Sequence, residues 1–278
     1  MIEALNSKGV DVYADLVLNH MANEAWKRKD LNYPGSDVMN QYAEYSDYFE
    51  DNKLFGDINV QLFSAADFHP ANCITDYNDV WTVQHYRLCG GNGDPGLPDL
   101  NYGDWVTSQQ RQYVNALKEL GIKGFRIDAA KHMTFDQLNK IFTPEIKEGV
   151  ELFGELITHG GRGQTEYDRF LKPYLDRTSH SAYDFPLFMT IRSAFSFNGS
   201  FTELNNPEYR EQAIDPRRSI SFAITHDIVL NEGFRHLIMN EVDEKLANAY
   251  LIASGKTTPL VYSDHGESGE VRWVGAHN

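Results

Sequence analysis

The segment IKGFRID, residues 122–128, decides the fold, because a short apolar run ends there in a cation and a carboxylate. A helical pattern over 104–120 precedes it, with Asp104 placed to cap the helix and Gly121 placed to end it. A helix that leads into a strand apolar on both faces is typical of a parallel sheet covered by helices. We therefore predict a βα unit at this point of the chain.

The same alternation of strand and helix patterns extends in both directions. Five further strands are predicted, at 10–20, 150–156, 180–185, 220–227 and 259–264. Helical patterns cover 164–175 and 240–254, and the apolar face expected for the second helix consists of Leu246, Ala249, Tyr250 and Ala253. Strand then helix, repeated several times, predicts an α/β fold of about six βα units.

One long stretch, residues 21–103, interrupts this alternation. It is rich in Asn, Asp, Gly, Pro and aromatic residues and is far longer than a connection between neighbouring elements needs. We expect a small inserted domain at 21–103 and a catalytic domain formed by 1–20 and 104–278. Cys73 and Cys89 lie in the insertion, where a disulfide and two unlinked thiols are equally compatible with the sequence.

Charge and hydropathy exclude several classes of partner. The formal net charge is -15, from 25 basic and 40 acidic residues, and such a surface repels phosphate backbones and anionic lipids. No apolar run is long enough to span a bilayer. We expect neither nucleic acid nor membrane partners, whereas a neutral polymer such as a polysaccharide is compatible with the charge. The start, MIEALNSKG, resembles the end of an amphipathic helix and lacks the order of a secretory signal.

Polar residues follow several of the predicted strands. Arg126 and Asp128 are two positions apart and share a strand face, which alone indicates no more than a structural ion pair. The carboxyl ends of strands in a parallel barrel converge on the face where barrel enzymes carry their chemistry. Ionisable groups buried together cost stability unless they are paired. We therefore predict a functional site from the residues at these ends: Asn19, His20, Arg126, Asp128, Glu155, His226 and Asp227.

Four segments carry a resemblance to a known family. DLVLNH (15–20), GFRIDAAKH (124–132), GEL (154–156) and FAITHD (222–227) resemble, in order and spacing, the four signature regions of the α-amylase family of glycoside hydrolases, and LPDLN (97–101) resembles a fifth. The resemblance implies a (β/α)8 TIM-type barrel with the inserted B domain at 21–103. A complete barrel of this type has eight strands, so we expect an incomplete one.

The resemblance also implies an activity, which is hydrolysis of α-1,4-glucosidic bonds in starch-type glucans by a retaining double displacement. In that mechanism Asp128 is the nucleophile, Glu155 is the general acid and then base, and Asp227 is the third, supporting carboxylate. Retention requires the two reacting carboxyls to lie about 5 Å apart. The residues implied to bind the substrate are His20, Arg126, Lys131, His132 and His226.

Calcium is the cofactor that the resemblance implies. Asn19, Asp99 and the backbone carbonyl of His132 match family positions that bind Ca²⁺, a cation that prefers oxygen ligands. A further ligand is expected within TVQHYRLCGGNGD (82–94) but cannot be assigned there. Chloride is not expected, because Thr225 stands where chloride-activated relatives carry Asn.

Alternative functions stay open at this point. A transglycosylase or an α-glucosidase of the same family would use the same carboxylates, and a truncated chain could be a non-catalytic glucan-binding or assembly protein. Six strands leave open edges at 10–20 and 259–264, so a second copy of the chain is a candidate partner, unless the chain is a portion of a longer protein. The family resemblance implies secretion.

Overall fold

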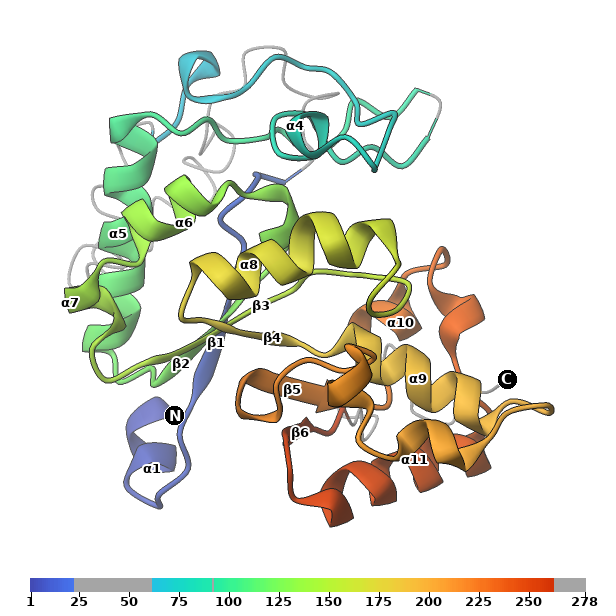
Figure 1. The fold of residues 1–278 in the computed structure, drawn as a ribbon. Helices are drawn as coiled ribbons and strands as arrows, with labels where there is room; N and C mark the ends of the chain where they lie inside the picture. The colour runs from blue at the N-terminus through green and yellow to red at the C-terminus, as the bar shows by residue number, and fades with distance from the viewer. Residues whose placement is uncertain (23–61, 92, 263–278) are drawn as a thin grey trace. The chain divides into compact units, whose positions relative to one another are not determined.

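The computed structural model describes residues 1–22, 62–91 and 93–262, and it divides into two compact units, Met1–Glu155 and Leu156–Asn278 (Figure 1). The first unit contains a parallel sheet whose strands follow chain order: β1 (Tyr13–Leu16), β2 (Gly124–Ile127) and β3 (Glu151–Gly154). Leu16 is paired with Ile127, and Ile127 with Gly154, so the three strands end in register. Asp128 and Glu155 each come one residue after these ends.

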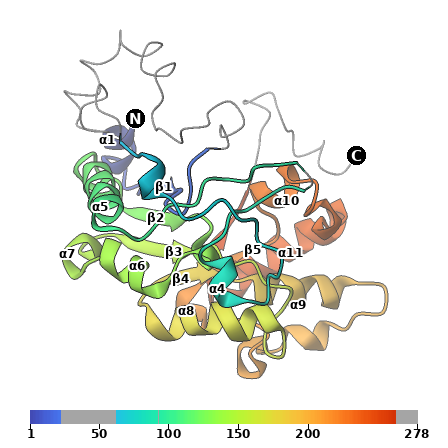
Figure 2. The same ribbon diagram turned by 90° about the horizontal axis from the view of Figure 1, so that it is seen from above.

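The helices of the first unit are α1 (Ile2–Asn6), α5 (Asp104–Glu119), α6 (Phe135–Ile141) and α7 (Pro144–Lys147), and α5, α6 and α7 flank β1–β3 in both views (Figure 1 and Figure 2). The prediction that Asp104 caps α5 is wrong, because Gly103 is the N-cap and Asp104 is the first helical residue. A carboxylate there still stabilises the positive end of the helix dipole. Gly121 follows the helix with a φ of 95°, as its predicted role as a helix terminator requires.

The described part of the predicted insertion, 62–103, has little regular structure. It contains the 3-10 turn η2 (Ala65–Asp67), the short helix α4 (Val80–Val83) and a small apolar core around Phe63 and Phe68. Residues 23–61 lie outside the described residues, and the boundaries of the inserted domain stay a prediction.

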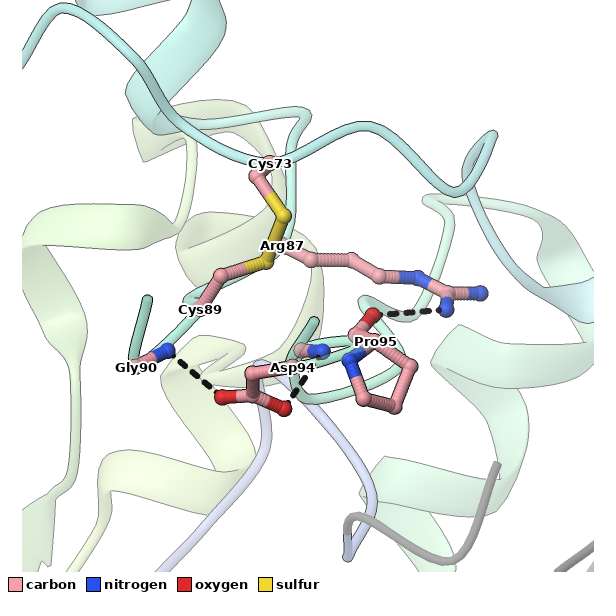
Figure 3. The surroundings of a disulfide bond; sticks show 7 residues. Cys73, Arg87, Cys89, Gly90, Asp94 and Pro95 are labelled. Carbon is pink, nitrogen blue, oxygen red and sulfur yellow. Dashed lines mark hydrogen bonds between the residues drawn. A yellow bond between two sulfur atoms is a disulfide. The ribbon is translucent and has the colours of Figure 1, made fainter. Parts of the chain in front are cut away.

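Cys73 and Cys89 form a disulfide with an S–S distance of 2.08 Å, so of the two possibilities the linked pair is the observed one (Figure 3). Beside it the Asp94 carboxylate accepts hydrogen bonds from the backbone N–H groups of Gly90 and Gly96, at 2.5 and 3.0 Å. Arg87 donates to the carbonyl of Pro95 at 3.2 Å. The loop is therefore closed by one covalent bond and several polar contacts.

The second unit contains three more parallel strands: β4 (Ser181–Tyr183), β5 (Ser219–Phe222) and β6 (Thr258–Leu260). Its core is aromatic, and the rings of Phe185 and Phe188 each lie 5.0 Å from that of Phe222. The longer helices are α8 (Lys172–Arg177), α9 (Phe185–Phe195), α10 (His226–Leu230) and α11 (Glu241–Ser254). The π-helical turn η4 (Tyr167–Leu171) precedes α8, and 3-10 turns form η5 (Phe201–Leu204), η6 (Pro207–Arg210), η7 (Pro216–Arg218) and η8 (Arg235–Leu237).

All six predicted strands are present, although each is only three or four residues long. The predicted apolar face of α11 is wrong: its buried residues are Glu244, Ala247 and Leu251, and Leu246 is 50% exposed. A carboxylate takes part in the buried face, and a search for apolar periodicity cannot detect it. Among the helices that the structure describes, none is both long and apolar enough to cross a membrane.

Candidate active site

The first unit gathers three carboxylates around one buried cation, Arg126 on β2. Its Nη1 lies 2.8 Å from Asp128 Oδ1 and 2.7 Å from Asp15 Oδ1, and its Nη2 lies 2.6 Å from Glu155 Oε1. Burial lowers the pKa of Arg126, but the charges of Glu155, Asp15 and Asp128 outweigh it and the pKa is raised. The guanidinium therefore stays charged and binds all three carboxylates.

The expected contact between Arg126 and Asp128 is present, but the cation is also shared with Glu155 and Asp15. Asp15 lies in DLVLNH and was not singled out as a site residue. Strand register explains the contact, because Asp15 on β1 is directly paired with Arg126 on β2. Opposite charges at such cross-strand positions attract each other. Register cannot be read from a single strand, so the sequence pattern missed this partner.

The backbone after Asp128 turns sharply toward Glu155. Ala129 has a φ of 47°, a left-handed conformation that is strained for a residue with a Cβ. Its N–H donates to Glu155 Oε2 at 3.3 Å, and the N–H of Lys131 donates to the Glu155 carbonyl at 3.3 Å. Each side-chain oxygen of Glu155 therefore accepts a hydrogen bond. Oε1 accepts from Arg126, and Oε2 accepts from the N–H of Ala129 in the strained turn.

The other residues predicted in this unit surround the cluster. Burial lowers the pKa of His20, and the nearby Asp128 carboxylate partly offsets the shift. Burial and the charge of Lys131 lower the pKa of His132 to about 3, so its ring is neutral, and its Nδ1–H donates to the carbonyl of Val83 at 3.0 Å. Lys131 is buried, with Nζ 5.9 Å from the centre of the Tyr77 ring.

His226 and Asp227 lie in the second unit, in the first turn of α10. Thr225 caps this helix by accepting from the N–H of Ile228 at 3.4 Å. His226 Nε2 lies 3.3 Å from Asp227 Oδ2, and each side chain is about a third exposed, at 37% and 35%. Both side chains are therefore partly accessible to a ligand. The catalytic role of Asp227 stays a prediction.

The residues predicted to bind calcium are buried in the first unit. Asn19 Oδ1 is buried and has no hydrogen-bond partner among the described residues. Asp99 is 1% exposed; burial raises its pKa, and a 2.6 Å hydrogen bond from His69 Nδ1 to its Oδ2 acts in the opposite direction. An unpartnered oxygen and a buried carboxylate near each other fit a hard cation, which would favour the ionised carboxylate.

A fourth candidate oxygen comes from Gln84, within the segment where the sequence left a ligand unassigned. The Tyr102 hydroxyl contacts the backbone carbonyl of Gln84 and also lies 3.5 Å from the carbonyl of His132. Both carbonyl oxygens therefore lie close to the same hydroxyl group. Gln84 is fixed by its side chain, which donates to the Met133 carbonyl at 3.1 Å. A backbone ligand carries no residue-type signal, which is why sequence reasoning missed it. In the part of the chain that the structure describes, no three His, Cys, Asp or Glu side chains form a metal site by themselves.

A sequence model of the alpha amylase catalytic domain matches residues 1–189. The chain belongs to the α-amylase family. It is 56% identical to an α-amylase of Aeromonas hydrophila over 276 residues, which is 98% of this chain and 60% of that protein. It is 33% identical to an α-amylase-related protein of Drosophila ercepeae over 95% of this chain and 51% of that one. The chain thus spans half to three fifths of the length of these relatives.

Solved structures share the fold. An α-amylase I from Eisenia fetida matches 95% of this chain and 52% of its own, with a TM-score of 0.66 and 22% identity. A cyclomaltodextrin glucanotransferase with a three-domain ABC distribution matches 100% of this chain and 52% of its own, with a TM-score of 0.69 and 22% identity. The prediction of an incomplete (β/α)8 barrel is confirmed, and so is that of an α-amylase-type catalytic domain.

Proposed function

We propose that this chain carries the machinery for retaining hydrolysis of α-1,4-glucosidic bonds in starch-type glucans. The observation that supports this most is the single guanidinium of Arg126 bound to both Asp128 and Glu155. Two carboxyls that reach one planar group are close enough for one to attack a sugar carbon while the other serves the leaving oxygen. Retaining glycosidases need carboxyls about 5 Å apart.

In this mechanism Asp128 attacks the anomeric carbon and Glu155 gives a proton to the departing oxygen. The same Glu155 then takes a proton from the water that releases the glycosyl group. Glu155 is paired with Arg126 in this structure, but it must carry a proton to act as the acid. We expect a bound glucan to separate Glu155 from Arg126, which would leave the cation with Asp128 and Asp15 and leave Glu155 protonated.

Sugar binding is proposed for the residues around this cluster and on the second unit. His20, Lys131 and His132 follow β1 and β2, and His226 lies beside Asp227 on α10. Because its Nδ1–H donates to Val83, the neutral His132 ring offers Nε2 as a hydrogen-bond acceptor without a competing charge. Asp227 would support the distorted sugar through its 2-hydroxyl.

The direct test is starch hydrolysis by the purified chain beside two matched variants, Glu155→Gln and the exposed control Glu148→Gln. We expect Glu155→Gln to lose at least about 100-fold in the release of reducing ends, the lower bound for removing a general acid. Glu148→Gln should equal the wild type. Equally slow release by wild type and Glu155→Gln would overturn the proposal for this chain.

Transfer to a sugar acceptor is the second candidate function, because a glucanotransferase shares this fold. Hydrolysis and transfer share the covalent intermediate and differ in whether water or a sugar hydroxyl receives the glycosyl group. Product analysis with maltoheptaose and added glucose separates them. Longer or glucose-capped products would favour transfer, and shorter maltooligosaccharides alone would favour hydrolysis.

We also propose that Asn19, Asp99 and the backbone carbonyls of Gln84 and His132 hold Ca²⁺. The bound ion would link the 62–103 segment, through Gln84 and Asp99, to the residues that follow β1 and β2, through Asn19 and His132. A ligand that binds only the folded state raises its stability, so millimolar Ca²⁺ should raise the melting temperature and EDTA should reverse the gain. Asp99→Asn should remove this response. Equal responses of wild type and Asp99→Asn would exclude this site.

A further inference from the structure

A cavity lined entirely by residues of the second unit is not used by the proposed mechanism. It has a volume of about 480 Å³ and is formed by η4, α8 and the 3-10 turns η6 and η7. This volume falls in the range of pockets that bind small molecules. The lining residues used below are Tyr167, Lys172, Asp176, Glu208, Tyr209 and Glu211.

Two tyrosines give the cavity the character of a binding site. Tyr167 is only 4% exposed, and it is one of the residues that line the cavity. Burial and the surrounding carboxylates, Glu211 foremost, raise its pKa to about 12, so the hydroxyl remains a donor. Tyr209 is 83% exposed and offers a flat apolar ring at the same cavity.

The turn that carries Tyr209 is held in a strained conformation. Asn206 and Glu211 flank η6, and both have left-handed backbones, with φ values of 49° and 54°. Such strain persists only where neighbouring contacts enforce it. Gly161 supplies one of these contacts, because a Cβ there would lie 1.8 Å from the carbonyl oxygen of Glu211. The surrounding structure therefore constrains the backbone of η6, the turn that carries Tyr209.

The charges at the cavity are largely neutralised by local ion pairs. Glu211 lies 3.2 Å from Lys172 and 3.3 Å from Arg162, and Glu208 lies 3.3 Å from Lys256. Ions that already have partners attract a charged ligand weakly, but their oxygens still accept hydrogen bonds. A neutral ligand rich in hydroxyl groups fits such a surface better than a cation or a phosphate does.

We propose that this cavity binds a segment of α-glucan, with one sugar ring packed on Tyr209 and sugar hydroxyls bonded to Tyr167, Asp176 and Glu208. The choice of a glucan over other polyols rests on the proposed function, whereas the site itself does not. Aromatic faces bind the apolar faces of sugar rings, and carboxylates accept from the hydroxyls.

The test is calorimetric titration with maltoheptaose, performed in a Glu155→Gln background so that the ligand is not cleaved. Tyr209→Ala should weaken binding at this site about tenfold, the loss expected for one aromatic packing contact. Tyr209→Phe should retain binding, because it keeps the ring. Phe197→Ala, which removes another fully exposed aromatic of the same unit, should have no effect.

Tyr167→Phe supplies an independent readout, because it removes one hydroxyl and keeps the packing. It should weaken maltoheptaose binding several-fold and leave the melting temperature unchanged. Unchanged affinity in both Tyr209→Ala and Tyr167→Phe would overturn the proposal, as would binding of spermidine but not maltoheptaose. A chain that hydrolyses no starch but loses maltoheptaose binding on Tyr209→Ala would refute the proposed activity and support this site.

Discussion

Glu155 in the first unit and Asp184 in the second are both buried carboxylates, but they are compensated in different ways. In the first unit Glu155, Asp128 and Asp15 share the guanidinium of Arg126. In the second unit Asp184 is fully buried and makes no ion pair with a described cation. Its oxygens accept from neutral donors, the N–H of Leu187 at 2.9 Å and the hydroxyl of Ser219 at 2.7 Å.

The difference separates a site suited to chemistry from a structural one. A shared cation lets carboxylates exchange partners when a ligand arrives, and the Asp128 side chain is 21% exposed and within reach of that ligand. Neutral donors fix Asp184 at the start of α9, where it caps the helix. Burial raises its pKa to about 7, although Ser219, Leu187 and Ile214 act in the opposite direction. The candidate active site therefore differs from the structural site at Asp184 in two respects: its carboxylates are paired with a cation, and Asp128 is partly exposed.

The largest expected effect comes from removing the shared cation by Arg126→Met. This change leaves Glu155, Asp128 and Asp15 without their cation, and breaking a buried ion pair costs about 3–5 kcal/mol. We expect a loss of that order in the free energy of unfolding, measured with urea. Arg111→Met, which removes a partly exposed side chain on α5, is the control and should change stability little. A loss of less than about 1 kcal/mol in Arg126→Met would show that the cluster is not held by this cation.

The sequence could predict the Arg126–Asp128 contact because two residues on one strand share a face regardless of the rest of the fold. The contacts of Arg126 with Asp15 and Glu155 depend on register between strands, which the pattern of one strand does not contain. Asp184 lies in the predicted strand 180–185, but its role was missed. An Asp followed closely by Pro186 is a helix-start signal and could have revealed the cap.

Other features depend on contacts that residue types do not encode. The carbonyl of Gln84 became a candidate ligand only when the Tyr102 hydroxyl was seen between it and His132. The cavity at Tyr209 requires the packing of Gly161 against Glu211, and these two residues are far apart in the sequence. Helix termini and strand ends could be predicted from local patterns, whereas sites built from backbone atoms or distant turns could not.

A smaller effect is expected for Asp184→Asn, and it depends on pH. Between the ordinary value of 3.8 and the folded value of about 7, native Asp184 keeps a proton that the unfolded chain has lost. Wild-type stability should therefore fall as pH rises through this window, by at most about 1.4 kcal/mol per pH unit, and Asn does not titrate. The stability of Asp184→Asn relative to wild type should rise from pH 5 to 7 and level off above.

The control for this measurement is Asp215→Asn. Asp215 is exposed, and the hydrogen bonds from Arg217 lower its pKa to about 2, so it is ionised in both states across the same pH range. Its difference from wild type should be flat with pH. A flat difference for Asp184→Asn as well would mean that the neutral donors keep the buried carboxylate ionised, and the contrast between the two units would then lie only in the presence of a cation.

The smallest effect is expected for Asp15→Asn, and its sign should depend on Arg126. The Asp15 side chain is 46% exposed, and its two oxygens lie 2.7 and 2.8 Å from Nη1 of Arg126, so in the wild type the change should cost only about 0.5 kcal/mol. In the Arg126→Met background it should instead increase stability, because Asp15 then only repels Asp128 and Glu155. Urea unfolding of both single variants and the double variant measures this coupling. Additive effects would mean that Asp15 does not interact with Arg126. The groups that share the cation would then be only Asp128 and Glu155, the two carboxylates that are proposed to react.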